Sequence, residues 1–348
     1  YGVLIQTMIM YNEYRLEPTM KNILLLLSKS YEFINDIIVR QDEKSKLKIM
    51  SVQPHLRFLS DHSSSSDDED NFTVANNAFT ADIKVFVLID TALSQGKIDD
   101  WNMAQEFARV KRTAERLLAC MLQLMIYKKT FQGSVTCATL LKCIKRQMWE
   151  NSVDRLAQQV KGIGDVFAKK ITEGIKVLKR HENDDTPISI EDLRKMSSFQ
   201  LEKATNHKTG WGVPIVEDIQ KIPKYSLTFQ KSSDTEIVLT VMNMSNFDPP
   251  NQYHQADVFI GMNDHLIDHF LLKKVTAHMN VSFPFIVDTE HFDPSNIVLT
   301  IIDSDFVGID IIQKVTFDGN QFNQNDMDQI NVNVESQNEV TSHYFTKK

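Results

Sequence analysis

The spacing of hydrophobic and polar residues changes along the chain, from a helical period in the first half to short alternating runs in the second. Up to about residue 180, apolar residues recur every three or four positions, as on one face of an amphipathic helix. An early helix, with Pro18 and Thr19 as start signals, is predicted from the apolar positions Met20, Ile23, Leu24, Leu27 and Tyr31. A further helix is predicted around residues 79–93.

The longest periodic segment predicts a helix over residues 102–128. Its apolar stripe consists of Phe107, Val110, Ala114, Leu117, Leu118, Met121 and Leu124. Another face carries three arginines at positions i, i+3 and i+7, namely Arg109, Arg112 and Arg116. This row is a candidate contact surface for an anionic partner. Helix-surface ion pairs with Glu106 and Glu115 are a competing explanation for part of it.

From about Lys224 the pattern changes to short runs rich in Val, Ile, Phe and Thr, separated by polar turn clusters such as 248–251 and 293–296. Strands are predicted at 225–230, 236–244, 256–262, 266–272, 281–287, 297–302 and 309–317. This number of short strands predicts an antiparallel β-sandwich of immunoglobulin or fibronectin type. No cysteine falls in the region, so the disulfide of antibody domains is absent.

The most specific short motif is that of a helix-hairpin-helix, Leu156-x-x-x-Val160-Lys161-Gly162-Ile163-Gly164-x-x-x-Ala168-x-x-Ile171. Gly162 and Gly164 permit a tight turn whose N–H groups, at the start of the second helix, can hold a nucleic-acid phosphate. Asp165 would repel a phosphate, although it also suits a helix N-terminus. The basic residues around the turn are Lys161, Lys169, Lys170, Lys176, Lys179 and Arg180. A hairpin that only braces neighbouring domains is the alternative.

Together these elements predict an α+β multidomain chain. A helical bundle over 1–150 precedes the helix-hairpin-helix domain at 151–222, the immunoglobulin-like sandwich at 223–318 and a flexible tail at 319–348. Within the bundle, residues 60–71 are rich in Ser, Asp and Glu and contain no apolar anchor, so we expect a disordered insertion there.

Charge is distributed unevenly in this composition. The 42% hydrophobic and 24% charged residues are typical of a soluble globular protein, and no apolar run is long enough for a transmembrane helix. The net charge is −8, yet residues 101–180 carry 16 Lys and Arg against 6 Asp and Glu. A basic island in an acidic chain is typical of a surface that contacts phosphates. The alternative is that these lysines only form the solvent-exposed faces of helices and bind no phosphate.

No motif for catalysis or metal binding stands out. The Gly96-Lys97 step is the only Gly-Lys pair, and it lacks the Ser or Thr of a nucleotide-binding loop. His265 and His269 fall on a predicted strand about 13 Å apart, too far to share a metal. We expect no catalysis, cofactor or metal site in this chain. The chain has three cysteines, Cys120, Cys137 and Cys143, which form no CxxC pair and leave one unpaired in any disulfide scheme. This pattern favours a reducing nuclear or cytosolic compartment.

The element order and several short strings resemble the Sec63 domain, the accessory C-terminal module of Ski-two-like superfamily-two helicases. The early strings are Tyr31-Glu32-Phe33, Ile38-Val39-Arg40-x-x-Glu43 and Leu56-Arg57-Phe58. The later strings look most like the meiotic crossover helicases of the Mer-three type: Lys161-Gly162-Ile163-Gly164, Gly212-x-x-Ile215 and Ile222-Pro223-Lys224-Tyr225-Ser226-Leu227. The resemblance covers nearly the whole chain.

The resemblance implies a nuclear ATP-dependent DNA helicase that moves 3′ to 5′ and unwinds recombination intermediates to favour crossovers. Its motor domains, which would use ATP and magnesium, would precede Tyr1, since the chain looks like a segment of a longer polypeptide. The helix over 102–128 would be the ratchet helix, with Arg109, Arg112 and Arg116 contacting single-stranded or branched DNA. The other implied partners are the motor domains themselves and, through the sandwich, a MutL-type mismatch-repair heterodimer; no membrane is implied.

Two other interpretations fit the same architecture. One is a module of a spliceosomal or RNA-surveillance RNA helicase, which would serve mainly as a protein-docking scaffold. The other is the endoplasmic-reticulum translocation factor that gave the domain its name, which has no motor and acts through protein contacts. A phosphate-binding loop upstream of Tyr1 would distinguish the helicases from the translocation factor.

Overall fold

A computed structural model describes residues 2–58, 79–182, 184–232, 236–286 and 297–315. The chain divides into two compact units, Tyr1–Trp149 and Glu150–Lys348. The acidic segment at 60–71, the turn at 293–296 and the tail from 319 lie outside the described residues. Within the described ranges, no helix combines the length and the hydropathy that crossing a membrane requires. Helices and two antiparallel sheets together make the chain an α+β protein, as predicted.

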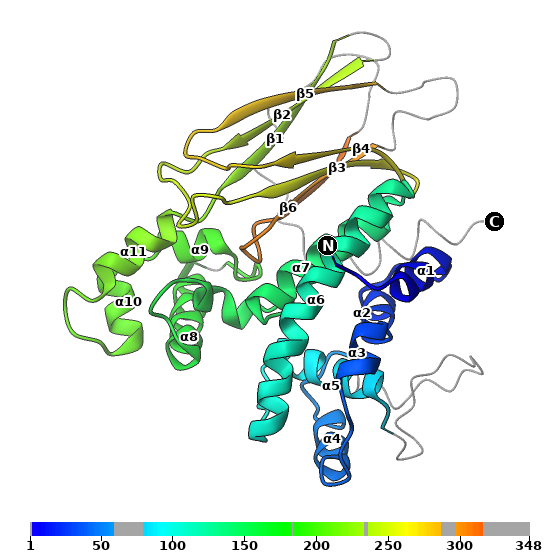
Figure 1. Cartoon of the computed structure of the whole chain (residues 1–348). Helices are drawn as coiled ribbons and strands as arrows, with labels where there is room; N and C mark the ends of the chain where they lie inside the picture. Colours follow the sequence, from blue (N-terminus) through cyan, green and yellow to red (C-terminus); the bar gives the residue numbers. More distant parts are fainter. Residues whose placement is uncertain (1, 59–78, 183, 233–235, 287–296, 316–348) are drawn as a thin grey trace. The chain divides into compact units, whose positions relative to one another are not determined.

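The first unit is helical. Its helices are α1 (Ile5–Glu13), α2 (Met20–Ser28), α3 (Tyr31–Asp36), α4 (Lys44–Ser51), α5 (Ala81–Leu93), α6 (Trp101–Tyr127) and α7 (Phe131–Arg146). The predicted helices at 79–93 and 102–128 correspond to α5 and α6, and α6 is the longest helix in Figure 1. Residues 85–89 of α5 are all buried, so this helix is surrounded by the others. The core of the unit forms where α2, α5, α6 and α7 pack together.

Side chains define where these helices begin and end. The predicted start at Thr19 is confirmed, since its Oγ1 accepts a hydrogen bond from Asn22 N at 3.2 Å. The placement of Tyr31 in the same helix is wrong, because α2 ends at Ser28 and Tyr31 begins α3. Ser30 has an extended backbone, and its Oγ donates to Leu27 O at 2.5 Å, which ends the helix.

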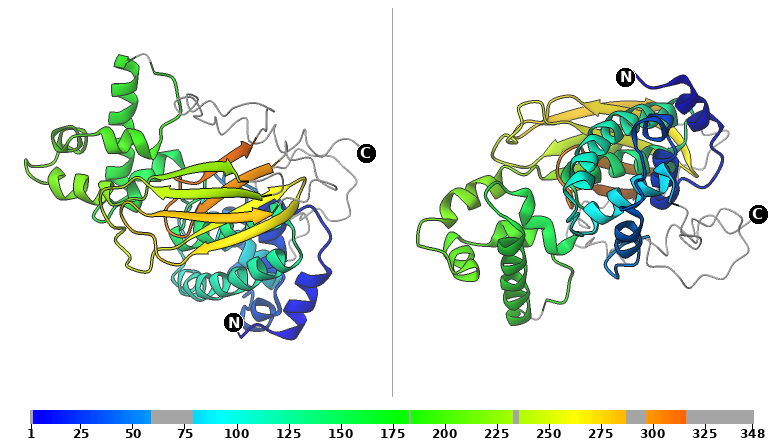
Figure 2. Two further views of the ribbon diagram at one scale, coloured as in Figure 1. Left: turned by 90° about the horizontal axis from the view of Figure 1, so that it is seen from above. Right: turned by 60° about the horizontal axis from the view of Figure 1, so that its bottom comes forward.

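The second unit begins with helices. They are the 3₁₀ segment η2 (Val153–Gln159) and the helices α8 (Asp165–Glu182), α9 (Ile190–Lys195), α10 (Ser198–Thr205) and α11 (Gly212–Gln220), of which α8 is the longest. Capping boxes start two of them: Ser189 with Asp192 at α9, and Ser197 with Gln200 at α10. Figure 1 and Figure 2 show α8 to α11 gathered at one end of the strands of this unit.

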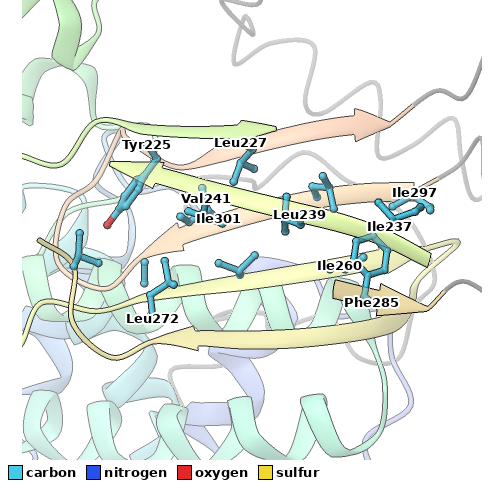
Figure 3. Packing of buried hydrophobic residues seen from close by; sticks show 14 of the residues in the cluster. Tyr225, Leu227, Ile237, Leu239, Val241, Ile260, Leu272, Phe285, Ile297 and Ile301 are labelled. Atoms are coloured by element: carbon cyan, nitrogen blue, oxygen red, sulfur yellow. The ribbon is translucent and has the colours of Figure 1, made fainter. Parts of the chain in front are cut away.

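Seven strands follow the helices among the described residues, close to each of the predicted ranges. They are β1 (Tyr225–Lys231), β2 (Glu236–Asn243), β3 (Ala256–Met262), β4 (His265–Leu272), β5 (Asn280–Ile286), β6 (Ile297–Asp303) and β7 (Ile311–Val315). They form one sheet in the order β1-β2-β5 and another in the order β4-β3-β6-β7, with every pairing antiparallel. Apolar residues from both sheets share one core, in which Leu239 and Val241 of β2 lie near Ile260 and Ile301 (Figure 3).

A buried histidine links the ends of three strands in this unit. His254 is fully buried between two carboxylates, with Nε2 2.6 Å from Asp303 Oδ2 and Nδ1 3.1 Å from Asp305 Oδ2. Tyr225 Oη donates to the same Asp303 oxygen at 2.6 Å. Burial alone would lower the pKa of His254, but the hydrogen bonds and charges of Asp303 and Asp305 outweigh it and raise the pKa to about 9.

The raised pKa of His254 predicts that the second unit loses stability as the pH rises. The unfolded chain releases this proton near pH 6.5, whereas the folded protein holds it to about pH 9. The resulting stabilisation is therefore complete below pH 6.5 and is lost by about pH 9; it amounts to about 3 kcal/mol. We expect urea unfolding, followed by circular dichroism between pH 6 and pH 10, to show this decline.

The variant His254→Asn should be less stable than the wild type at pH 6 and should approach it at high pH. His278→Asn is the matched control, because His278 is exposed and has a φ of 52°, which asparagine tolerates. It should retain the wild-type pH dependence. Stability curves that remain parallel for the wild type and His254→Asn would show that His254 does not titrate as the structure requires.

Candidate nucleic-acid interface

The arginine row of α6 lies on the outside of the first unit. Arg109, Arg112 and Arg116 are all exposed, and a rotation of about 100° per residue places them within about 60° of one another around the helix. On the opposite side, the predicted stripe is buried at Val110, Ala114, Leu117, Leu118 and Met121, and half-buried at Phe107 and Leu124. The helix therefore separates a core face from a basic face, as its sequence predicts.

The expected ion pairs account for little of this row. Arg109 Nη2 is 3.9 Å from Glu106 Oε1, a long contact, and Glu106 is itself only 3% exposed. Arg112 Nε donates to Ala108 O at 3.3 Å within the helix. Arg116 Nη1 donates to Gly2 O at 2.6 Å, which leaves its other donors at the exposed surface.

Two exposed aromatic residues lie on the same face of α6, although the predicted row did not include them. Trp101 is 73% exposed at the start of the helix and Tyr127 is 83% exposed at its end. Eleven residues, about three turns, separate Trp101 from Arg112, and eighteen residues, about five turns, separate Arg109 from Tyr127. Each aromatic residue is thus a whole number of helical turns from an arginine. This spacing could have predicted from the sequence that Trp101 and Tyr127 share the face of the arginines.

The space beside Arg109 is too small for a nucleotide. A hollow of about 40 Å³ lies between α3 and α6 and is lined by Phe33, Asp36, Ile37, Arg109, Val110 and Thr113. This volume would accommodate about one water molecule. A polyanion would not fit into this hollow and would contact Arg109 along the open surface of the helix.

A buried lysine fixes the rotation of α6. Lys84 of α5 is fully buried, with Nζ 2.6 Å from Glu43 Oε2, 2.5 Å from Glu106 Oε2 and 2.9 Å from Ile38 O. Arg40 Nη1 lies 3.0 Å from Glu43 Oε1 and Nη2 lies 3.8 Å from Glu106 Oε1. The string Ile38-Val39-Arg40-x-x-Glu43 thus binds Lys84 and joins it to α6. Burial raises the pKa of Glu43, but hydrogen bonds from Lys84 and the backbone of Arg40 outweigh it and keep the pKa below its ordinary value.

The predicted hairpin joins η2 to α8 in the second unit. The four apolar motif positions are all buried: Leu156, Val160, Ala168 and Ile171. Gly162 has a φ of 87°, which strains any other residue, so the turn requires glycine there. Gly164 has no positive φ, and no heavy atom lies within 4 Å of the position that its Cβ would take. The backbone therefore does not require glycine at 164, contrary to the expected role of both glycines in the turn.

The charges around the hairpin are partly neutralised by ion pairs. Asp165 Oδ2 lies 3.2 Å from Lys169 Nζ, so the carboxylate expected to repel a phosphate is paired with one of the candidate phosphate ligands. Lys179 is only 7% exposed and is held 2.8 Å from Asp184 Oδ2 and 3.3 Å from Asp192 Oδ2. Lysines that remain exposed near the turn are Lys161, Lys169 and Lys170.

The arginine row and the hairpin belong to different units of the chain, so each is a separate candidate surface. Among the residues that the structure describes, His, Cys, Asp and Glu side chains form no group that could hold a metal ion. His265 and His269 both lie on β4, as expected, and His269 Nε2 is 2.8 Å from Asp257 Oδ1. All three cysteines are buried, and they form no disulfide.

Comparison with known proteins shows the family. The family model of the Sec63 Brl domain matches residues 1–346 of this chain. Because the match covers nearly the whole sequence, the chain belongs to the Sec63 Brl domain family, and the resemblance noted in the sequence is confirmed.

Several curated relatives are helicases by name. The chain is 24% identical over 333 residues to the probable ATP-dependent DNA helicase HFM1 of Xenopus tropicalis, covering 90% of this chain and 23% of that protein. It is 23% identical over 276 residues to the ATP-dependent DNA helicase homolog MER3 of Arabidopsis thaliana, covering 76% of this chain and 23% of the relative. It is also 24% identical over 325 residues to the Arabidopsis thaliana DExH-box ATP-dependent RNA helicase DExH13, covering 89% of this chain and 13% of the relative. The chain thus spans less than a quarter of the length of each of these proteins.

The burial of Lys84 predicts a large loss of stability when its charge is removed. Lys84→Met would leave the buried Glu43 and Glu106 with only the half-exposed Arg40 as a shared cation, at an expected cost of about 3–5 kcal/mol. Lys46→Met is the matched control, because Lys46 pairs with Asp100 at the surface and should matter much less. Denaturant unfolding measures both changes. Equal losses for the two variants would contradict the importance of the buried network.

Proposed function

We propose that this chain is the non-catalytic accessory module of an ATP-dependent DNA helicase of the Mer-three type, and that it guides single-stranded nucleic acid past the motor. The observation that carries the proposal is the row of exposed arginines on α6, in a chain that belongs to the Sec63 Brl domain family. The relatives named as HFM1 and MER3 DNA helicases support the choice of DNA. ATP and magnesium would be bound by the motor domains of the whole protein.

The arrangement of charge and aromatic rings supports the contacts that we propose. Arg109, Arg112 and Arg116 would bind successive phosphates along the helix, because guanidinium groups pair well with phosphate oxygens. Trp101 and Tyr127 would offer ring faces for unpaired bases at the two ends of the same face. The hairpin would add phosphate contacts through its turn, at Lys161, Gly162, Gly164, Lys169 and Lys170.

We further propose that the second unit comprises a helix-hairpin-helix domain at 151–222 and an immunoglobulin-like sandwich at 223–318. The strand order of the two sheets and their shared core support the second assignment. The HFM1 and MER3 names of the relatives support the predictions of a role in meiotic crossover formation and of a nuclear location. Binding of a MutL-type heterodimer by the sandwich stays a prediction.

A second candidate function is that of an accessory module in an RNA helicase. The match to an RNA helicase over 89% of this chain favours it, since one architecture can serve both kinds of motor. In that case RNA would replace DNA on the arginine face, or the module would serve mainly as a scaffold for other proteins. The translocation-factor interpretation stays an untested alternative.

Reversal of the arginine row tests the proposal. In fluorescence anisotropy with labelled single-stranded DNA, Arg109→Glu, Arg112→Glu and Arg116→Glu together should weaken binding by at least about tenfold. Removal of three phosphate contacts should also reduce the slope of log K against log salt by about 2. Parallel titrations with RNA and duplex DNA would distinguish the DNA and RNA candidates.

The matched control changes the net charge equally at a different place. Lys273→Glu, Lys274→Glu and Lys314→Glu replace three exposed lysines of the sandwich region and should leave the affinity within about twofold of the wild type. If both triple variants weaken binding equally, the arginine row affects binding only through the net charge of the chain and is not a specific contact surface. An unchanged affinity after reversal of the arginines would show that the ratchet assignment is wrong.

A further inference from the structure

Three aromatic rings form a compact cluster beside the hairpin. Phe167 lies in the first turn of α8, and His207 and Trp211 lie in the segment between α10 and α11. The rings of His207 and Trp211 stack, with centroids 4.6 Å apart and planes at 23°. Phe167 meets both rings nearly edge-on, at 5.8 Å from His207 and 5.4 Å from Trp211. All three side chains are partly exposed, so the cluster reaches the surface.

The backbone around the rings is held in place by local hydrogen bonds. The buried Glu202 carboxylate accepts from Gly210 N at 2.7 Å and from Gly212 N at 2.9 Å, one residue before and one residue after Trp211. A Cβ at Gly212 would lie 2.5 Å from Ser198 O, so α11 starts in close contact with α10. The Trp211 backbone is thus ordered before a ligand arrives, which lowers the entropy cost of binding.

The charge near the cluster favours an anionic ligand. Lys170 follows Phe167 by one helical turn, and its Nζ lies 3.4 Å from Thr205 O near the start of the His207 segment. Lys203 at the end of α10 and Lys208 in the segment after it are both exposed. The nearby Glu202 carboxylate accepts hydrogen bonds from two backbone N–H groups, and its single negative charge stands against three lysines.

We propose that Phe167, His207 and Trp211 form a stacking platform for an unpaired nucleobase, while the adjacent hairpin turn contacts the phosphate backbone of the same strand. This inference rests on the proposed nucleic-acid function and adds a site to it. Aromatic rings stack on any base, since every base has a π face, so the platform is tolerant of sequence. It requires an unpaired base, because bases within a duplex are stacked on their neighbours.

An oligonucleotide without bases separates stacking from phosphate binding. The full 348-residue chain is titrated with labelled oligothymidylate and with an abasic oligonucleotide of the same length. Trp211→Ala should weaken binding to oligothymidylate by about 5- to 100-fold and should leave the affinity for the abasic strand unchanged. Trp211→Phe retains a ring and should recover most of the loss.

Further variants keep the outcome clear. His207→Ala should show the same base-dependent loss and is used if Trp211→Ala fails to fold by circular dichroism. Phe199→Ala removes an aromatic side chain of α10 that is 70% exposed and lies outside the cluster, and it should change neither affinity. If the cluster variants weaken both oligonucleotides equally, or neither, the stacking platform is wrong although the proposed function stands. If the wild-type chain binds neither strand, both proposals are overturned, and a protein partner for this surface becomes the better explanation.

Discussion

The helical unit depends on the buried positive charge of Lys84. An ammonium group that has lost its water is tolerated only where carboxylates replace the water, and Lys84 finds them in Glu43 and Glu106. Glu106 belongs to α6, so its contact with Lys84 orients the Glu106 side of that helix toward the core. Arg109 follows Glu106 by one turn, at the edge of the outward side. The buried ion pair thus determines which side chains of α6 remain available to a partner.

The basic residues of this chain have two distinct tasks. Some stabilise the fold, as Lys84 does in the first unit and Lys179 does between Asp184 and Asp192 in the second. Others, including the arginine row of α6, stay exposed and can pair with phosphates. Net charge over a stretch of sequence cannot separate the two groups, because both contribute equally to it.

Both proposed binding surfaces combine positive charge with aromatic rings. On α6 the arginines are flanked by Trp101 and Tyr127, and near the hairpin the lysines accompany the cluster that contains Trp211. Contacts of this kind suit a module that must accept any single strand as it moves.

Local patterns along the chain were enough to predict the longest helix and the strands. Helical periodicity predicted α6 within one residue at each end, and alternation of Val, Ile and Phe located all seven described strands, because both patterns are local. Strings such as Ile38-Val39-Arg40-x-x-Glu43 also indicated the family, because they are local too. Local patterns did not predict contacts between residues that are far apart in the sequence. Lys84 and Glu43 are 41 positions apart, and Phe167 and Trp211 come from separate helical segments. Only tertiary packing decided which charges are buried, which glycine the hairpin requires and which aromatic rings lie together, because these contacts have no period along the chain.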